Sequence, residues 1–203
     1  MLARFARLAH VGVAVLAFAF HCTPVVADTE EPRFELIAQW PEKNIELRVY
    51  GASIIAVASM EATGNGGFST LAGYIFGGNT AEQKIAMTAP VKTSMAGSEV
   101  QEMAFVMPSK FDENTLPQPN NPDIELRPVD GYAAAVIIFS GRASPEKAEK
   151  QWAMLQEFLD ASEIKLLGPP TLNQYNPPWT LPFLRRNEII VPIDRASVPE
   201  ERG

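Results

Sequence analysis

The chain has 203 residues, of which 46% are hydrophobic, and it carries a formal net charge of −7 at pH 7. This length is enough for one packed domain with its own hydrophobic core. An acidic surface repels phosphate backbones, so we expect no nucleic-acid partner.

Residues 1–27 are predicted to be a signal peptide for export. Arg4 and Arg7 give a positively charged start, an uncharged and mostly apolar run covers residues 11–20, and Ala27 places a small residue at the expected cut. The apolar run is shorter than the roughly 20 residues that a membrane-spanning helix needs. We therefore expect cleavage after Ala27, a periplasmic or secreted location, and no stable membrane insertion of the mature chain.

Cleavage of this leader would change the chemistry of the chain. The only histidines and the only cysteine, His10, His21 and Cys22, lie within it, and its two arginines leave the mature chain with a formal charge of about −9. Without histidine or cysteine, residues 28–203 can form neither a Ser-His-Asp or Cys-His triad nor a zinc site with those ligands. Two alternatives stay open: a lipid anchor on Cys22 and a leader that is retained as a membrane anchor.

The first half of the mature chain is predicted to contain strands around one short helix. Residues 45–50 alternate between apolar and polar side chains, as in a half-buried strand, and residues 53–60 form a second strand. From Lys84 to Val91 a period of two predicts another strand, which Pro90 restricts to an edge or a bulge. The helix lies between them, because apolar residues recur there at steps of three and four: Phe68, Leu71, Tyr74 and Ile75.

A strand predicted at residues 102–107 ends the first half, and a proline-rich loop at residues 108–122 borders the second. In the second half, strands are predicted at residues 132–139, whose continuous apolar run is typical of burial on both faces, and at residues 187–192. Ser144 and Pro145 indicate a helix start, with serine as the cap and proline at the first position. The predicted buried face of this helix consists of Ala148, Trp152, Leu155 and Leu159.

The two halves resemble each other at an offset of 79 residues. Glu46-Leu47-Arg48 recurs as Glu125-Leu126-Arg127, and the same offset places Pro90 on Pro169 and the first helix on the second. We interpret this as a duplicated strand-strand-helix-strand module, with a chance tripeptide match as the alternative. The predicted fold class is α+β: a curled antiparallel sheet or distorted β-barrel with two helices.

Several short motifs, in order and over roughly residues 35–193, resemble the signature of the SOUL haem-binding protein family. They are Tyr74-Ile75-Phe76-Gly77, Asn79, residues 84–91 (KIAMTAPV), Phe105-Val106-Met107-Pro108, Phe139-Ser140-Gly141, Tyr175-Asn176-Pro177-Pro178 and Arg186-Asn187-Glu188-Ile189. The resemblance implies the same architecture in a single domain, residues 28–203. It also implies haem b or another tetrapyrrole as a bound ligand rather than as a catalytic cofactor.

A tetrapyrrole needs an apolar slot for its rings and cations near its two propionates. Because histidine is missing, we expect the ligand to be held mainly by apolar contacts, although each candidate below would also suit an ordinary core. The candidate slot is Phe68, Leu71, Tyr74 and Ile75. The candidate cations are Lys84, Lys92, Arg185 and Arg186, and any axial ligand would come from Met60, Met87, Tyr74 and Tyr175.

Two alternatives come from the GyrI-like domains, which resemble SOUL proteins in their duplicated module. They include drug-binding modules and some hydrolases that use a glutamate. The first alternative is therefore a binding module for another flat apolar molecule. The second is a hydrolase with Glu188 as the base, although beside Arg185 and Arg186 that carboxylate is more typical of a structural ion pair. We expect a binding protein rather than an enzyme.

Overall fold

The computed structural model describes residues 29–60, 67–95 and 101–198. Within these ranges the helices are α1 (Phe68–Ile75) and α2 (Pro145–Ala161), with short 3-10 helices at Pro41–Lys43, Pro182–Leu184 and Arg195–Ser197. The strands are β1 (Phe34–Trp40), β2 (Ile45–Tyr50), β3 (Ser53–Ser59), β4 (Val91–Ser94), β5 (Glu102–Val106), β6 (Ile124–Val129), β7 (Tyr132–Phe139), β8 (Thr171–Gln174) and β9 (Asn187–Pro192).

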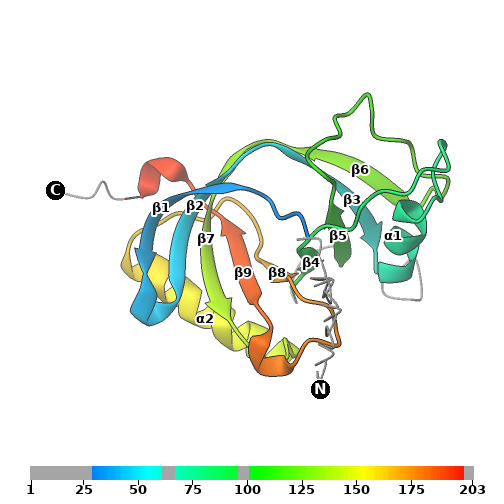
Figure 1. The fold of residues 1–203 in the computed structure, drawn as a ribbon. Coiled ribbons are helices and arrows are strands. Elements are labelled where there is room, and N and C mark those ends of the chain that lie inside the picture. Colours follow the sequence, from blue (N-terminus) through cyan, green and yellow to red (C-terminus); the bar gives the residue numbers. More distant parts are fainter. Residues whose placement is uncertain (1–28, 61–66, 96–100, 199–203) are drawn as a thin grey trace, which may run out of the picture.

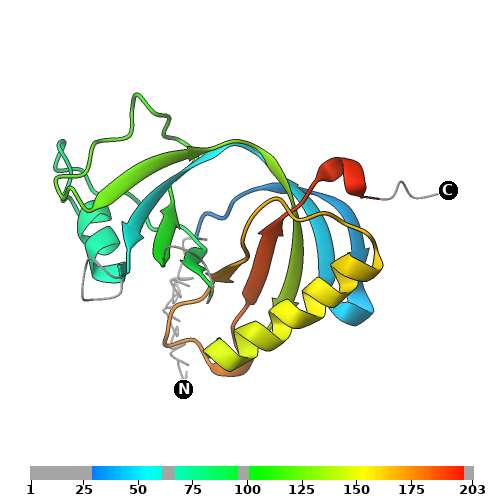
Figure 2. The same ribbon diagram turned by 180° about the vertical axis from the view of Figure 1, so that it is seen from behind.

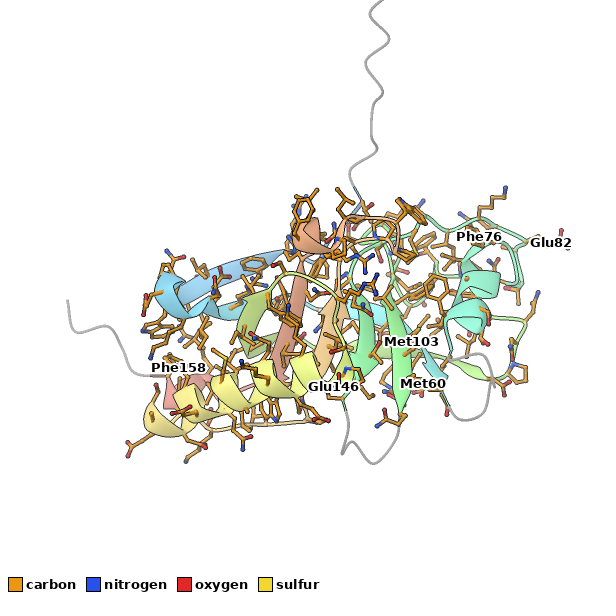
Figure 3. The ribbon with its side chains drawn as sticks, turned by 90° about the horizontal axis from the view of Figure 1, so that it is seen from below. Met60, Phe76, Glu82, Met103, Glu146 and Phe158 are labelled. Carbon is orange, nitrogen blue, oxygen red and sulfur yellow. The ribbon has the colours of Figure 1, made fainter. Side chains whose placement is uncertain are left out.

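All these strands belong to one antiparallel sheet in the order β1-β2-β7-β9-β8-β4-β5-β3-β6. The sheet curls into a half-barrel, and the two helices lie at opposite ends of it (Figure 1). Figure 3 shows the same separation, with Phe158 on α2 and Phe76 just after α1 on opposite sides of the molecule. The predicted α+β class and the curled antiparallel sheet are confirmed.

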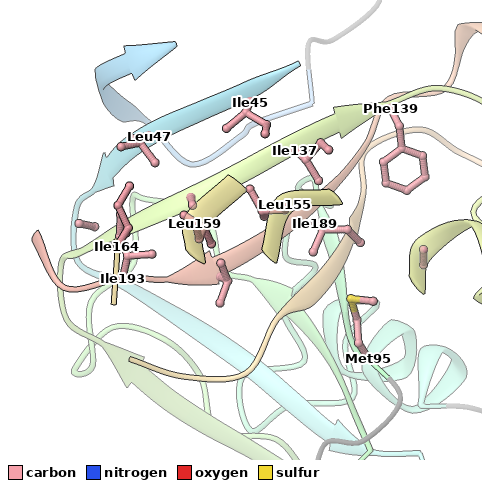
Figure 4. Close-up of a cluster of buried hydrophobic side chains, with 14 residues drawn as sticks. Ile45, Leu47, Met95, Ile137, Phe139, Leu155, Leu159, Ile164, Ile189 and Ile193 are labelled. Carbon is pink, nitrogen blue, oxygen red and sulfur yellow. The ribbon is translucent and has the colours of Figure 1, made fainter. Parts of the chain in front are cut away.

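Helix α2 covers one half of the sheet, as the view from behind shows (Figure 2). The helix begins as predicted, because the side chain of Ser144 accepts a hydrogen bond from the backbone N–H of Lys147 and Pro145 occupies the first turn. Leu155 and Leu159 are fully buried and point at the sheet, where Ile137 and Ile189 complete the cluster (Figure 4). The prediction for Trp152 was wrong in part: it is half-buried and packs at the margin of this cluster.

Helix α1 covers the other half, and its predicted bounds are confirmed to within one residue. The chain leaves it through a turn in which Gly77 has a φ of +113°, a conformation that glycine adopts without strain. The strand predicted from Lys84 was wrong. Residues 84–90 contain only isolated bridges at Lys84 and Thr88, and β4 begins at Val91. Pro90 explains this boundary, because it has no N–H for a strand ladder.

The strand order has a two-fold regularity. Exchanging each strand with its counterpart in the other half, β2 with β6, β3 with β7, β4 with β8 and β5 with β9, reverses the order β2-β7-β9-β8-β4-β5-β3-β6 onto itself. The pair β4–β8 lies at the centre of this strand order and divides the sheet into two spatial halves. This regularity agrees with the 79-residue offset, and the duplication remains our interpretation of it.

We expect Leu155→Ala to lower the free energy of unfolding by about 2–5 kcal/mol, because truncating a buried leucine leaves a cavity. Met154→Ala, in the same helix and 45% exposed, should change it by no more than about 0.5 kcal/mol. Denaturant unfolding of both variants checks this. Similar losses for the two variants would contradict the orientation of α2.

Candidate functional site

The face of the sheet opposite the helices, called the inner face below, carries charged and aromatic side chains. On β2 and β9, alternate residues such as Leu47 and Ile189 pack toward α2, so their neighbours Arg48 and Glu188 point the other way. The polar residues of these strands therefore meet inside the curve of the sheet.

Arg48 and Glu188 form a buried ion pair on the inner face. The guanidinium donates to both carboxylate oxygens, at 3.0 and 3.3 Å, and the two residues are only 3% and 1% exposed. The carboxylate also accepts from the hydroxyl of Tyr175 at 2.7 Å. Arg48 donates in addition to Glu46 at 2.7 Å and to the hydroxyl of Tyr50 at 2.9 Å. The pair is thus enclosed in a network that uses its donors and acceptors.

Burial and neighbouring groups shift the pKa of the arginine and of both tyrosines in this network. Burial opposes the charge of Arg48, but Glu188 and Tyr50 together outweigh burial and raise the pKa of Arg48. Burial raises the pKa of Tyr50 and of Tyr175, so both phenols stay protonated and act as donors or neutral partners. Glu188 lines none of the four hollows described below. This arrangement is that of a structural ion pair, as expected. The main partner of Glu188 is Arg48, 140 residues away, and of its neighbours in sequence Arg186 also pairs with it, with Nε 3.7 Å from Oε1.

The apolar slot predicted on α1 coincides with the second hydrophobic core. Leu71, Tyr74 and Ile75 are at most 2% exposed and pack with Ala56, Ala58, Ile85 and Phe105. The hydroxyl of Tyr74 donates to the carbonyl of Pro117 at 2.8 Å, and burial raises its pKa to about 12, which makes iron coordination by the phenolate costly. Phe68 alone is open to solvent, at 49%. These four residues line none of the four hollows.

The other predicted site residues are dispersed. Lys84 and Met87 are exposed in the segment before β4, and Met60 is half-buried just after β3. Tyr175 lies on the inner face, with its ring 3.7 Å from the guanidinium carbon of Arg186. The structure therefore does not bring the predicted slot, cations and axial ligands together in one place. It does bring two of the cations, Arg185 and Arg186, into a shared groove.

This basic groove has a volume of about 530 Å³ and lies where β7 ends and α2 begins. Its walls contain both polar and apolar side chains, and four of its residues carry a positive charge. The lining consists of Lys43, Asn44, Ile138, Phe139, Ser140, Lys147, Gln151, Met154, Leu184, Arg185 and Arg186, without a carboxylate among them. Sequence reasoning missed Lys43, Lys147 and Met154, because they belong to segments about 100 residues apart.

A larger hollow of about 680 Å³ has the opposite character. It lies between the segment before β1 and the loop after β5, and five acidic residues and one arginine line it: Glu30, Glu31, Asp112, Glu113, Asp130 and Arg33. A dianionic ligand would be repelled here. Of these two hollows, charge therefore favours the basic groove for a ligand with two carboxylates.

Lys92, another predicted cation, lies apart from the groove at the centre of the inner face. It belongs to β4 and pairs across the strands with Asn173 of β8. Burial lowers the pKa of Lys92. Within the described parts of the chain its ammonium group has no hydrogen bond or ion pair. The side chain lines two adjoining hollows, of about 310 and 30 Å³.

Comparison with known protein families assigns the chain. A model described as "SOUL heme-binding protein" matches residues 29–192, which is most of the sequence. The chain belongs to the SOUL haem-binding protein family. The resemblance seen in the short motifs is thereby confirmed, and haem or a related tetrapyrrole is the ligand class associated with the family. A search of curated proteins finds no match.

Solved structures share the fold of this SOUL domain at very low sequence identity. The EcmrR C-terminal domain has a TM-score of 0.57 at 11% identity, over 74% of this chain and 96% of that one. An uncharacterized conserved protein from Listeria innocua gives 0.56 at 7%, over 75% and 93%, and a hydrolase from the same organism gives 0.51 at 8%, over 75% and 92%. At these identities the likeness concerns the fold alone.

Two further properties of this SOUL protein bear on its site. In the described ranges, no cluster of three or more His, Cys, Asp and Glu side chains is placed to hold a metal ion. The same ranges contain no helix that is both long and apolar enough to cross a bilayer. The predicted signal peptide, residues 1–27, lies outside the described residues.

Arg48→Met is expected to lower the free energy of unfolding by about 3–5 kcal/mol, because it removes the buried cation that donates to both oxygens of Glu188, while Arg186 approaches that carboxylate only to 3.7 Å. The matched control is Arg127→Met. Arg127 pairs with Glu102 and Glu125 in the other half of the sheet, but its side chain is 39% exposed, so we expect a loss of about 0–1 kcal/mol. Denaturant unfolding of both variants measures the two losses. Equal losses of unfolding free energy would contradict the larger contribution of the buried pair.

Lys92→Met should raise the unfolding temperature at pH 7, because it removes an amine whose charged form is desolvated. The pKa of Lys92 is lower in the folded chain than the ordinary lysine value of 10.5, so the unfolded chain holds its proton over a wider range of pH. The penalty is therefore full below the folded pKa and disappears as pH rises toward 10.5. Thermal melts from pH 6 to 10 should show the advantage of the variant shrinking with pH. A constant advantage would contradict the shift.

Proposed function

We propose that this protein binds haem or a related tetrapyrrole in the basic groove between β7 and α2. The observation that carries the proposal is the charge of the groove: four cations and no carboxylate line a hollow of about 530 Å³ in a member of a haem-binding family. That volume lies within the usual range of small-molecule sites, about 300–1,000 Å³. Lys43, Lys147 and Arg185 would pair with the propionates, whereas Arg186 already pairs with Glu31 and Glu188.

Apolar contact would supply most of the affinity for the rings. Ile138, Phe139, Met154 and Leu184 line the groove, and Leu184 is 62% exposed. The segment that precedes Leu184 also leaves large apolar side chains open to solvent: Trp179 at 83%, Leu181 at 56% and Phe183 at 69%. Exposed apolar side chains gathered beside a hollow are typical of a binding surface.

Iron coordination would contribute little in this groove. The mature chain has no histidine or cysteine, and Met154 supplies the only sulfur among the lining residues. A thioether is a known axial ligand of haem iron, but Met154 is 45% exposed on the surface of α2. We therefore propose that the chain recognises the porphyrin and its propionates rather than the metal.

Export completes the proposal. Cleavage of residues 1–27 would leave an acidic protein that carries the tetrapyrrole in the periplasm or outside the cell. Binding without strong iron coordination suits a carrier, because the ligand can be passed on. The order of charge, apolar run and small residue in the leader supports this location.

Titration of the mature protein with haemin tests the groove. Lys147→Glu and Arg185→Glu should each weaken binding by about tenfold or more, equivalent to about 1.4 kcal/mol, because each change replaces an attraction for a propionate by a repulsion. Lys150→Glu is the matched control, since Lys150 is exposed on the same helix and does not line the groove. Equal effects of all three changes would indicate only general electrostatic attraction.

Two further titrations define the mode of binding. Metal-free protoporphyrin should bind within about tenfold of haemin, and Met154→Leu should affect both ligands alike. Phe68→Ala tests the exposed residue of α1 and should leave binding unchanged. If Phe68→Ala abolishes binding while the groove variants do not, the site lies on α1. If an uncharged aromatic molecule of similar size binds as tightly as haemin, the alternative of another flat apolar ligand replaces this proposal.

A further inference from the structure

Lys92 has surroundings unlike those of an ordinary surface lysine. It sits on β4, where the two halves of the sheet meet, and its side chain lies on the inner face rather than pointing out to solvent. The larger hollow beside it has mostly apolar walls, which include Val129, Tyr132, Ile190 and Pro192, and the carboxylate of Asp130 also lines it. This position is distinct from the basic groove, with which it shares no lining residue.

Asn173, the cross-strand partner of Lys92, contributes a second unusual feature. Its side-chain nitrogen donates to the backbone carbonyl and to the hydroxyl of Thr171, both at 3.1 Å, which fixes the orientation of the amide. The residue is 0% exposed, yet its side-chain oxygen Oδ1 has no hydrogen-bond partner. Lys92 and Asn173 line the same small cavity of about 30 Å³. An unpaired acceptor in a protein interior is costly and calls for a partner.

We propose that Lys92 is a reactive amine that captures a small aldehyde or ketone as an imine, in the hollow between β9 and the β6–β7 corner. Burial among apolar walls favours the neutral form of an amine that makes no ion pair, and the neutral amine is the nucleophilic form. The hollow of about 310 Å³ admits a carbonyl compound with a short apolar body. The inference concerns a site separate from the tetrapyrrole groove and does not depend on it.

The chemistry proceeds without an external redox partner. The lone pair of Nζ attacks the carbonyl carbon, the π electrons of the carbonyl move to its oxygen, and a proton passes from nitrogen to that oxygen. The hydroxyl of the resulting carbinolamine can donate a hydrogen bond to the unpaired Oδ1 of Asn173. The hydroxyl and the remaining proton on nitrogen then leave as water, and the nitrogen lone pair forms the carbon–nitrogen double bond of the imine.

Reductive trapping tests the inference. The full mature chain is incubated at pH 7 with limiting butanal and sodium cyanoborohydride, whose hydride converts the imine carbon to a stable secondary amine. Intact-mass measurement and peptide mapping should find one butyl adduct, located on Lys92. Exposed lysines in the same sample, such as Lys110, Lys150 and Lys165, serve as internal controls and should stay largely unmodified.

Variants make the result decisive. Lys92→Arg keeps the positive charge but cannot form the imine, so the adduct should be lost while circular dichroism and thermal unfolding show that the chain remains folded. Asn173→Ala should slow modification of Lys92 without moving it to another lysine. Should Lys92→Arg fail to fold, competition by a second aldehyde for Lys92 in the wild-type chain gives the same information, because only a real site saturates. Labelling of Lys92 no faster than that of the exposed lysines would overturn the proposal.

Discussion

The ion pair between Arg48 and Glu188 is the constraint on which one half of the inner face depends. Two charges buried on the inner face are stable only if each is paired and hydrogen-bonded, and here β2, β9 and the segment after β8 all contribute partners. The ring of Phe34 also lies 4.1 Å from the guanidinium carbon of Arg48, so β1 is tied to the same centre. Any shift of one strand against another would leave a charge without its partner. The pair therefore fixes register as much as it stabilises the fold.

The other half of the sheet contains a similar arrangement in a different environment. Arg127 of β6 bonds Glu125 of the same strand and Glu102 of β5, at the positions that match Arg48, Glu46 and Glu188 across the two-fold regularity. There, however, the side chains are partly open to water. The same set of one arginine and two glutamates thus forms a buried cluster on one side and a solvated cluster on the other. The difference lies in what covers them, since Tyr50 and Tyr175 shield only the first.

Local patterns made most of the fold predictable from sequence. The bounds of β7 and β9 follow from their apolar runs, and the start of α2 follows from Ser144 and Pro145, because capping and alternation act over a few residues. The beginning of β4 was missed, because alternation with a period of two also occurs in an extended segment such as residues 84–90, which makes only isolated bridges. Strands β1 and β8 have only weak alternation and depend on neighbours for pairing.

The site was harder to predict because its residues meet only after folding. Apolar residues at helical spacing suit a ligand slot and a core equally well, and Leu71, Tyr74 and Ile75 belong to the core. The ion pair of Glu188 with Arg186 was expected from their closeness in sequence and is present, yet the bidentate partner Arg48 is 140 residues away and no local pattern connects it to Glu188. Four separate segments build the basic groove. The charge of Arg185 and Arg186 was a signal for the groove, but their partners Lys43 and Lys147 carried no such signal.

The reversed strand order has a consequence for the integrity of each half. The first strand of each repeated module, β2 or β6, pairs with the second strand of the other module, β7 or β3, rather than with the second strand of its own module. A polypeptide cut in the loop between β5 and β6 would therefore yield two fragments with bare edges, each complementary to the other. Two copies of one fragment could cover those edges only by exchanging strands as a symmetric dimer. The covalent link between the halves thus holds them together, whereas the association of such a dimer would depend on protein concentration.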